Sequence, residues 1–409
     1  MTNQILPMDI RAFSPVEIID TGSRFDSGMP TSGIGLCLSG GGYRATLFHL
    51  GALWRLNQAG YLPKIDRISS VSGGSIIAGV LGLYWKELDF DQHGVATRFK
   101  AAILEPIRAI CSRTIDAGAI LGGALGPGSI GEKVIAAYRK FIYGDATLQD
   151  LPDKPRFVIN ATNVQSGALW RFMKPYMCDY RVGKVENPEV LLAVAVAAST
   201  AFPPFLSPLK LELDEADFIP VSGKDLQYAP FTTDIFLSDG GVYDNLGLET
   251  VWKKYDTVLV SDGGGKMQPE AEPKLDWARH TYRTLNLIDN QVRSLRKRRL
   301  IESYKLRNQL LNQGVETADE LFQRVTRKGA YWGIRSDIKK YGLDDVLDCP
   351  EQKTLELANT PTRMKRLDAN LQEKLINWGY AICDAALRQH VDSSLPAPTE
   401  FPYHQVGVG

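Results

Sequence analysis

Residues 33–45 read GIGLCLSGGGYRA, and residues 65–75 read IDRISSVSGGS. In each stretch a short apolar run ends in serine and glycine, and the chain that follows carries apolar residues at helical spacing. The order strand, tight glycine turn and helix therefore occurs twice in succession. Repetition of this order predicts a parallel β-sheet with helices packed on its faces, which is an α/β fold.

The composition is that of an ordinary globular protein. The chain has 409 residues, of which 44% are hydrophobic and 23% charged, so it can bury one large core or two to three smaller ones. Its 47 basic residues balance its 47 acidic residues, so any electrostatic partner must meet a local patch. Five cysteines without Cys-x-x-Cys spacing predict neither a disulfide framework nor a thiolate metal site.

The first residues lack a basic segment followed by an apolar one, and no apolar run is long enough to cross a bilayer. We therefore expect a soluble, cytoplasmic protein. We also expect a lead-in over 1–32, an α/β core over 33–265, a basic helical insertion over 266–330 that borders the cleft, and a helical part over 331–409 that completes the domain. Further strands are predicted over 157–162, 168–172, 235–238 and 257–261, and helices over 95–145 (interrupted by glycines at 118–128), 190–200 and 362–390.

Ser72 lies where a predicted strand ends and a predicted helix begins, with Ser70 before it and Gly73-Gly74 after it. This is the layout of a nucleophile elbow, in which a strained turn exposes a serine hydroxyl at the carboxyl edge of the sheet. The pattern Ser-x-Ser-x-Gly differs from Gly-x-Ser-x-Gly only in its first residue. The N–H groups at the start of the next helix favour negative charge there. The alternative is an ordinary serine-glycine turn.

Three glycines, Gly40, Gly41 and Gly42, follow the first strand and open their own helix. Consecutive glycine N–H groups at such a place can surround an oxyanion. A dinucleotide fingerprint is the competing interpretation, but Asp66, the acidic residue at the required distance, precedes its strand where the fingerprint needs one at the strand's end. Arg44, beside the glycines, could hold an anionic headgroup or a backbone carbonyl, or be a charge on the helix surface.

Two aspartates are candidates for the base that would activate Ser72. Asp239 and Asp262 each follow a predicted strand, and each begins the sequence Asp-Gly-Gly. A carboxylate at the end of a strand can reach the serine and accept its proton. Their spacing in the sequence does not distinguish them.

The chain resembles patatin-like phospholipases. The likeness is carried by GLCLSGGGYRA within 33–55, VSGGS at 71–75, AVAASTAFPPFLSP at 195–208 and DGGVYDNLG at 239–247. It implies a three-layer α/β/α fold with a mostly parallel central sheet, a helical insertion and a catalytic core over 33–265. It also implies a serine lipid acyl hydrolase of the phospholipase A or lysophospholipase type, acting on phospholipid or other acyl esters from the cytoplasmic side of a membrane.

The resemblance assigns roles to individual residues. Such proteins use a Ser-Asp dyad, which makes Ser72 the nucleophile and Asp239 the base, since only Asp239 is followed by the asparagine of the motif, Asn245. The glycine-rich loop becomes the oxyanion hole. The five histidines agree with a dyad, because none follows a predicted strand as a catalytic histidine would, and we expect His49 to be a helix residue packed behind the loop. We expect no metal and no organic cofactor.

A basic segment within the insertion offers a second kind of site. Seven basic residues and one acid lie between 291 and 310. A membrane could be contacted by five of them: Arg293, Arg296, Lys297, Arg298 and Arg299. A solvated or ion-paired helix face is the alternative, and nucleic acid is not expected because no aromatic stacking pattern accompanies the charges. The segment 202–206, FPPFL, could line an acyl channel or simply pack.

Two other functions fit the same residues. One is a patatin-fold effector that stays silent until a small nucleotide or a partner protein activates it. The other is a lipid-binding regulatory protein with little turnover, against which the intact dyad and glycine loop count. Hydrolysis of short acyl esters without an activator would separate these from a constitutive enzyme.

Overall fold

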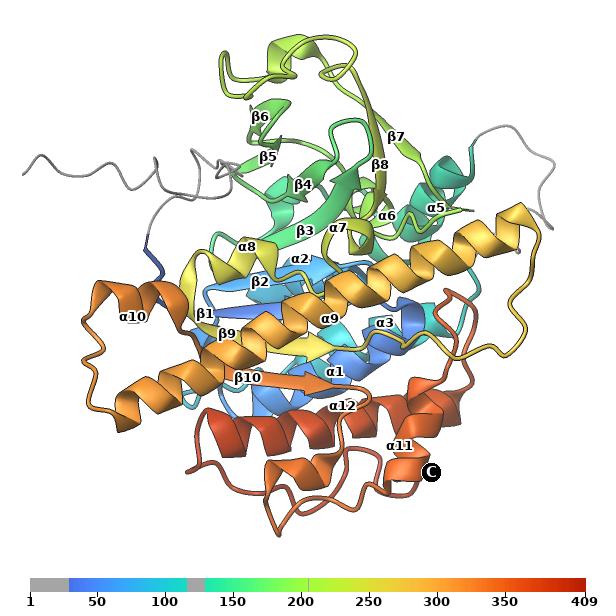
Figure 1. Ribbon diagram of the computed structural model, residues 1–409. Coiled ribbons are helices and arrows are strands. Elements are labelled where there is room, and N and C mark those ends of the chain that lie inside the picture. The colour runs from blue at the N-terminus through green and yellow to red at the C-terminus, as the bar shows by residue number, and fades with distance from the viewer. Residues whose placement is uncertain (1–28, 116–128, 205) are drawn as a thin grey trace, which may run out of the picture.

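A computed structural model describes residues 29–115, 129–204 and 206–409. Most of the predicted lead-in and the glycine-rich segment 118–128 lie outside the described residues. The described chain forms a central sheet covered by helices on both faces (Figure 1). The predicted three-layer α/β/α fold is confirmed.

The sheet has the strand order β10-β9-β1-β2-β3-β4-β5-β6, with β8 paired to β3 and β7. Its parallel part consists of β10 (Lys328–Gly333), β9 (Tyr255–Asp262), β1 (Thr31–Leu38), β2 (Arg67–Val71) and β3 (Arg156–Asn163). The antiparallel part consists of β4 (Ala168–Phe172), β5 (Tyr176–Asp179), β6 (Gly183–Glu186), β7 (Leu209–Glu212) and β8 (Asp234–Asp239). The sequence did not predict β5, β6, β7 or β10.

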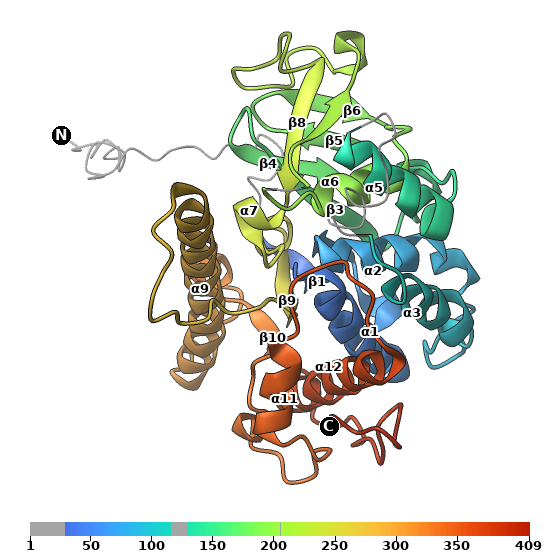
Figure 2. The ribbon, with the colours of Figure 1, turned by 90° about the vertical axis from the view of Figure 1, so that its right-hand side faces the viewer.

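The helices follow the predicted order, although the short ones were not foreseen. They are α1 (Gly42–Gln58), α2 (Gly73–Leu83), α3 (Glu105–Cys111), α5 (Ile130–Tyr138), α6 (Leu192–Ser199), α7 (Gly241–Asp244), α8 (Glu249–Trp252), α9 (Trp277–Asn312), α10 (Glu320–Val325), α11 (Glu351–Ala358) and α12 (Ala369–His390). In Figure 2, α9 lies on one side of β1 and β9, and α1 and α12 lie on the other.

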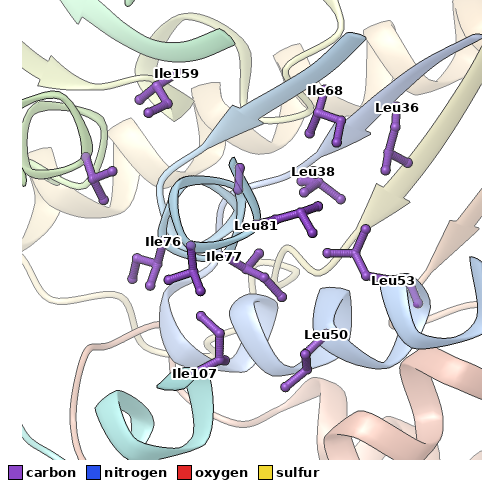
Figure 3. Packing of buried hydrophobic residues seen from close by; sticks show 14 of the residues in the cluster. Leu36, Leu38, Leu50, Leu53, Ile68, Ile76, Ile77, Leu81, Ile107 and Ile159 are labelled. Carbon is purple, nitrogen blue, oxygen red and sulfur yellow. The ribbon is translucent and has the colours of Figure 1, made fainter. Parts of the chain in front are cut away.

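Alternation along the strands divides the buried side chains into two cores. On β1, Leu36 and Leu38 belong to the large core under α1, α2 and α12, whereas Cys37 belongs to a smaller core. The smaller core receives Val251 from α8 and Leu300 from α9. Figure 3 shows part of the large core, where side chains of β1, β2, α1 and α2 meet. All five cysteines are buried and free.

Helix α1 carries the glycine loop at its start, and α12 fixes its position. Their backbones touch at two glycines: a Cβ on Gly51 would lie 1.9 Å from the carbonyl oxygen of Ile376, and one on Gly379 would lie 1.9 Å from that of Phe48. Farther along α1, Arg55 forms a buried ion pair with Asp384 at 2.8 Å. The close approach leaves no room for a side chain at either glycine.

We expect Gly51→Ala to lower the free energy of unfolding by about 3 kcal/mol, because backbone atoms cannot move aside as a flexible side chain would. Urea unfolding measures this. Gly131→Ala on α5 is the matched control: its Cβ would meet nothing closer than 3.4 Å, and alanine favours a helix over glycine by up to about 1 kcal/mol. Equal unfolding midpoints for the two variants would contradict this account of the helix contact.

Candidate active site

The pairing of β3 brings Ser72 and Asp239 together. Strand β4 occupies one edge of β3, and β2 and β8 share the other, with Val71 opposite Asn160 and Asp239 opposite Ala161. Strand β2 runs parallel to β3 and β8 runs antiparallel to it, so the carboxyl ends of β2 and β8 meet head to head. Both predicted catalytic residues therefore come to one point of the sheet.

Ser72 occupies a strained turn between β2 and α2. Its φ is +51°, a region that non-glycine residues rarely adopt and that occurs at functional sites. The turn fits only because its neighbours are glycines: a Cβ on Gly73 would lie 2.2 Å from the carbonyl oxygen of Gly42, and one on Gly74 would lie 2.3 Å from that of Leu38. The predicted elbow geometry is present.

Asp239 is a buried carboxyl with a raised pKa. Burial raises its pKa from 3.8 to about 7, although the Gly241 N–H and the Ser72 hydroxyl act in the opposite direction. Asp289 on α9 raises it further. Oδ1 accepts a hydrogen bond from the Gly241 N–H at 2.7 Å, and Oδ2 has no hydrogen-bond partner among the residues described. A carboxyl with this pKa can both accept and return a proton near neutral pH.

The glycine loop lies against the nucleophile. A Cβ on Gly40 would lie 3.1 Å from Cβ of Ser72, and the nitrogen of Gly42 is 2.9 Å from where a Cβ on Gly73 would stand. Gly40 already donates its N–H to the Asn245 carbonyl at 3.1 Å. Within the described chain the N–H groups of Gly41 and Gly42 have no acceptor. The loop therefore offers two free donors beside Ser72, and its first glycine holds the loop to α7.

The sequence did not identify Ser199 as part of the site. Its hydroxyl accepts a hydrogen bond from the Ser72 N–H at 2.9 Å and donates one to the Asn160 carbonyl at 2.7 Å. It thereby ties the nucleophile's backbone to β3 at the point where β2 and β8 meet. The only signal in the sequence is a serine at the end of an otherwise apolar helix, α6.

Arg44 and Asp262 serve the scaffold around the site. Arg44 is buried and donates to the carbonyls of Gly263 (3.1 Å) and Thr360 and to the Thr362 hydroxyl (2.9 Å). Of the three roles the sequence allowed, it fills that of holding backbone carbonyls. Asp262 accepts a hydrogen bond from the Tyr331 hydroxyl at 2.7 Å and lies 4.0 Å from the Arg293 guanidinium.

The five basic residues that could contact a membrane or form an ion-paired helix face divide into two groups. Arg293, Arg296 and Lys297 are partly buried, and Arg296 lies 3.0 Å from Glu249 and 3.6 Å from Asp244. Arg298 and Arg299 are exposed. Arg299 also lies over the Trp252 ring, with its guanidinium carbon 5.2 Å from the ring centre.

Two other features bear on the chemistry. His49 is buried on α1 behind the glycine loop, as expected, with its ring nitrogens 2.7 Å from the Ser261 hydroxyl and 2.9 Å from the Ser39 carbonyl. The described residues contain no group of three or more metal-ligating side chains, and none of the described helices is long and apolar enough to cross a membrane.

One protein family model covers more than half of this chain. The family model of patatin-like phospholipases matches residues 36–252, which is 217 of 409 residues. No curated protein sequence matches the chain. Human GIVD cytosolic phospholipase A2 has a similar structure, at 12% identity and a TM-score of 0.48, covering 88% of this chain and 61% of that chain. VipD from Legionella pneumophila is also similar, at 15% identity and a TM-score of 0.35, covering 88% of this chain and 67% of that one. The chain thus spans about three fifths of the human protein's length.

We expect Asp239→Asn to stabilise the protein above pH 7. Between pH 3.8 and about 7 the unfolded chain has released the proton that the folded protein keeps, so the wild type loses stability as pH rises through this window. The asparagine avoids this loss, which amounts to a few kcal/mol, at about 1.4 kcal/mol per pKa unit. Urea unfolding at pH 5 and pH 8 measures the difference, which should be larger at pH 8.

Asp262→Asn is the matched control and should have the opposite sign. Burial opposes ionisation of Asp262, but Arg293, the Tyr331 hydroxyl and the Gly264 N–H outweigh burial and lower its pKa. Its ionised form therefore stabilises the folded protein at neutral pH, and the asparagine should be less stable than wild type at pH 8. Destabilisation by both variants at pH 8 would contradict the raised pKa assigned to the buried carboxyl of Asp239.

Proposed function

The chain belongs to the patatin-like phospholipase family, and we propose that it is a lipid acyl hydrolase. It would cleave acyl esters of membrane lipids with a Ser72-Asp239 dyad. One observation carries the proposal. A strained serine and a buried carboxyl of pKa about 7 meet at the ends of β2 and β8. The free N–H groups of the glycine loop lie beside them.

The dyad acts in two steps. Asp239 accepts the proton of Ser72 as the hydroxyl oxygen attacks the ester carbonyl carbon, and then gives that proton to the departing alcohol or lysolipid. An acyl-serine remains. A water molecule next loses its proton to Asp239 and attacks the acyl carbon, which releases the fatty acid and returns the proton to Ser72.

The oxyanion of both steps would be held by the N–H groups of Gly41 and Gly42. Gly41 (φ +145°) and Gly42 (φ +60°) present these donors in backbone conformations that favour glycine. Preorganised donors of this kind typically contribute about 3–4 kcal/mol each to transition-state stabilisation. Ser199 contributes by positioning, since it holds the Ser72 backbone.

The first half of α9 supports action at a membrane surface. Trp277, Leu285, Ile288 and Leu295 recur on this helix with 48–83% of their surface exposed. Large exposed apolar groups of this kind mark interaction sites. Exposed Arg298 and Arg299 follow them along the helix, and a helix with apolar and basic side chains can lie in a lipid interface. We therefore propose that α9 contacts the lipid surface through this apolar face.

The dyad is tested by release of p-nitrophenol from a medium-chain acyl ester. Ser72→Ala and Asp239→Asn should each reduce kcat/KM by about 10³-fold or more. Because Asp239 must be ionised to accept a proton, the wild-type kcat/KM should rise with pH and level off above its pKa of about 7.

Asp262→Asn is the control for this assay and should keep both the activity at pH 8 and the shape of the pH profile. An active Asp239→Asn enzyme would reject the assignment of the base. A wild type inactive on every acyl ester without an activator would instead favour the gated effector.

Membrane contact is tested with vesicles. Ile288→Ser combined with Leu285→Ser should reduce binding to phosphatidylcholine–phosphatidylglycerol vesicles, and hydrolysis of lipid in them, by about tenfold or more, because two exposed apolar side chains no longer enter the interface. Hydrolysis of the p-nitrophenyl ester should not change. Leu321→Ser on α10, which removes a leucine that is even more exposed (67%, against 48% for Leu285 and 55% for Ile288), is the control. Equal vesicle binding by this control and the α9 variant would contradict the proposed contact.

A further inference from the structure

A pocket apart from the dyad lies at the carboxyl ends of β9 and β10, with a volume of about 360 Å³. Its lining includes Asp262 of β9, Gly333 of β10 and Leu355 of α11, and α9 contributes Arg293 and Lys297. None of its lining residues belongs to the dyad or to the glycine loop. Its volume lies within the range of small-molecule sites, and the carboxyl edge of a parallel sheet is where such sites occur.

The lining carries a surplus of positive charge. Four cations, Lys266, Arg293, Lys297 and Arg335, face a single carboxylate, Asp262, which leaves a net charge of +3. That carboxylate lies near Arg293. In the described part of the chain, Lys266, Lys297 and Arg335 take part in no ion pair. Cations gathered in a partly enclosed space repel one another unless an anion joins them.

The contacts of these side chains show unused donors. The buried Nε of Arg335 has no hydrogen-bond partner, although its Nη2 donates to the side chain of Asn359. Lys297 places its ammonium 4.2 Å from the centre of the Tyr331 ring. Burial and the neighbouring Arg293 lower the pKa of both Arg335 and Lys297. The pocket thus holds a buried donor without an acceptor and cations without counterions.

We propose that this pocket binds an anion that carries a phosphate group. A phosphate monoester brings nearly two negative charges and three acceptor oxygens, which suits the charge surplus better than a carboxylate does. The planar guanidinium groups of Arg293 and Arg335 can each donate two parallel hydrogen bonds to such a group. The phosphate could belong to a lipid headgroup or to a free phosphorylated compound, and the proposal does not depend on hydrolysis at Ser72.

Binding is measured in the Ser72→Ala background, so that no lipid is consumed. Pyrophosphate, followed by isothermal titration calorimetry, tests for a free compound. Vesicles of phosphatidylcholine with phosphatidate, compared with phosphatidylglycerol vesicles of equal surface charge, test for a lipid headgroup. The pocket variant is Lys297→Gln with Arg335→Gln. The control is Lys339→Gln with Lys340→Gln, which removes the same charge at exposed positions outside the pocket.

The pocket variant should weaken binding of pyrophosphate, or the preference for phosphatidate, by about tenfold or more, since each lost cation removes charge-assisted hydrogen bonds. The control should bind as the Ser72→Ala parent does. If the double variant fails to fold, Lys266→Glu takes its place. This change reverses a charge on an exposed side chain without disturbing the core and should weaken the same binding. The proposal is wrong if the pocket variants and the control bind pyrophosphate equally well and show the same preference for phosphatidate vesicles.

Discussion

The site depends on how β3 divides one of its edges between two strands. Strand β2 pairs with the first half of that edge and β8 with the second, and the two run toward each other until Val71 and Asp239 face the neighbouring residues Asn160 and Ala161. Neither strand could be longer without collision. The nucleophile and the base therefore emerge at a junction fixed by backbone hydrogen bonds, where a displacement of one residue would turn Asp239 to the other face of the sheet.

This junction leaves little room, so it contains a glycine and a residue with a strained backbone. Gly240 lies so close to Asn160 that a Cβ would stand 2.3 Å from that carbonyl oxygen, and Ser72 keeps a φ of +51°. Asp239 is buried with one oxygen lacking a hydrogen bond. Each feature costs stability, and each is needed where a reactive hydroxyl and an ionisable carboxyl must meet out of water.

The sequence could predict what is local and could not predict what depends on distant pairing. The strand, turn and helix around Ser72 and those around the glycines each depend on adjacent residues, so the sequence predicts both units. Asp239 and Asp262 look alike because each ends a strand before two glycines. They differ in the direction of their strands: β8 runs antiparallel to β3 toward Ser72, whereas β9 runs parallel to β1 and ends beside β10. Ser199 was missed because the residues that it contacts lie far along the chain. The short strands β5, β6 and β7 were missed because their sequence pattern is brief.

Helix α9 shows why charge along a sequence is a poor guide to where that charge acts. Its basic run could contact a membrane or form an ion-paired helix face, and Arg296 turns toward Asp244 and Glu249, which anchors the helix beside α7 and α8. One turn earlier, Arg293 reaches Asp262 in the cationic pocket, and Asp289 acts on the pKa of Asp239. The same helix exposes apolar side chains in its first half. Helix α9 thus carries the exposed apolar side chains, two cations of the pocket and a carboxylate that acts on the pKa of Asp239.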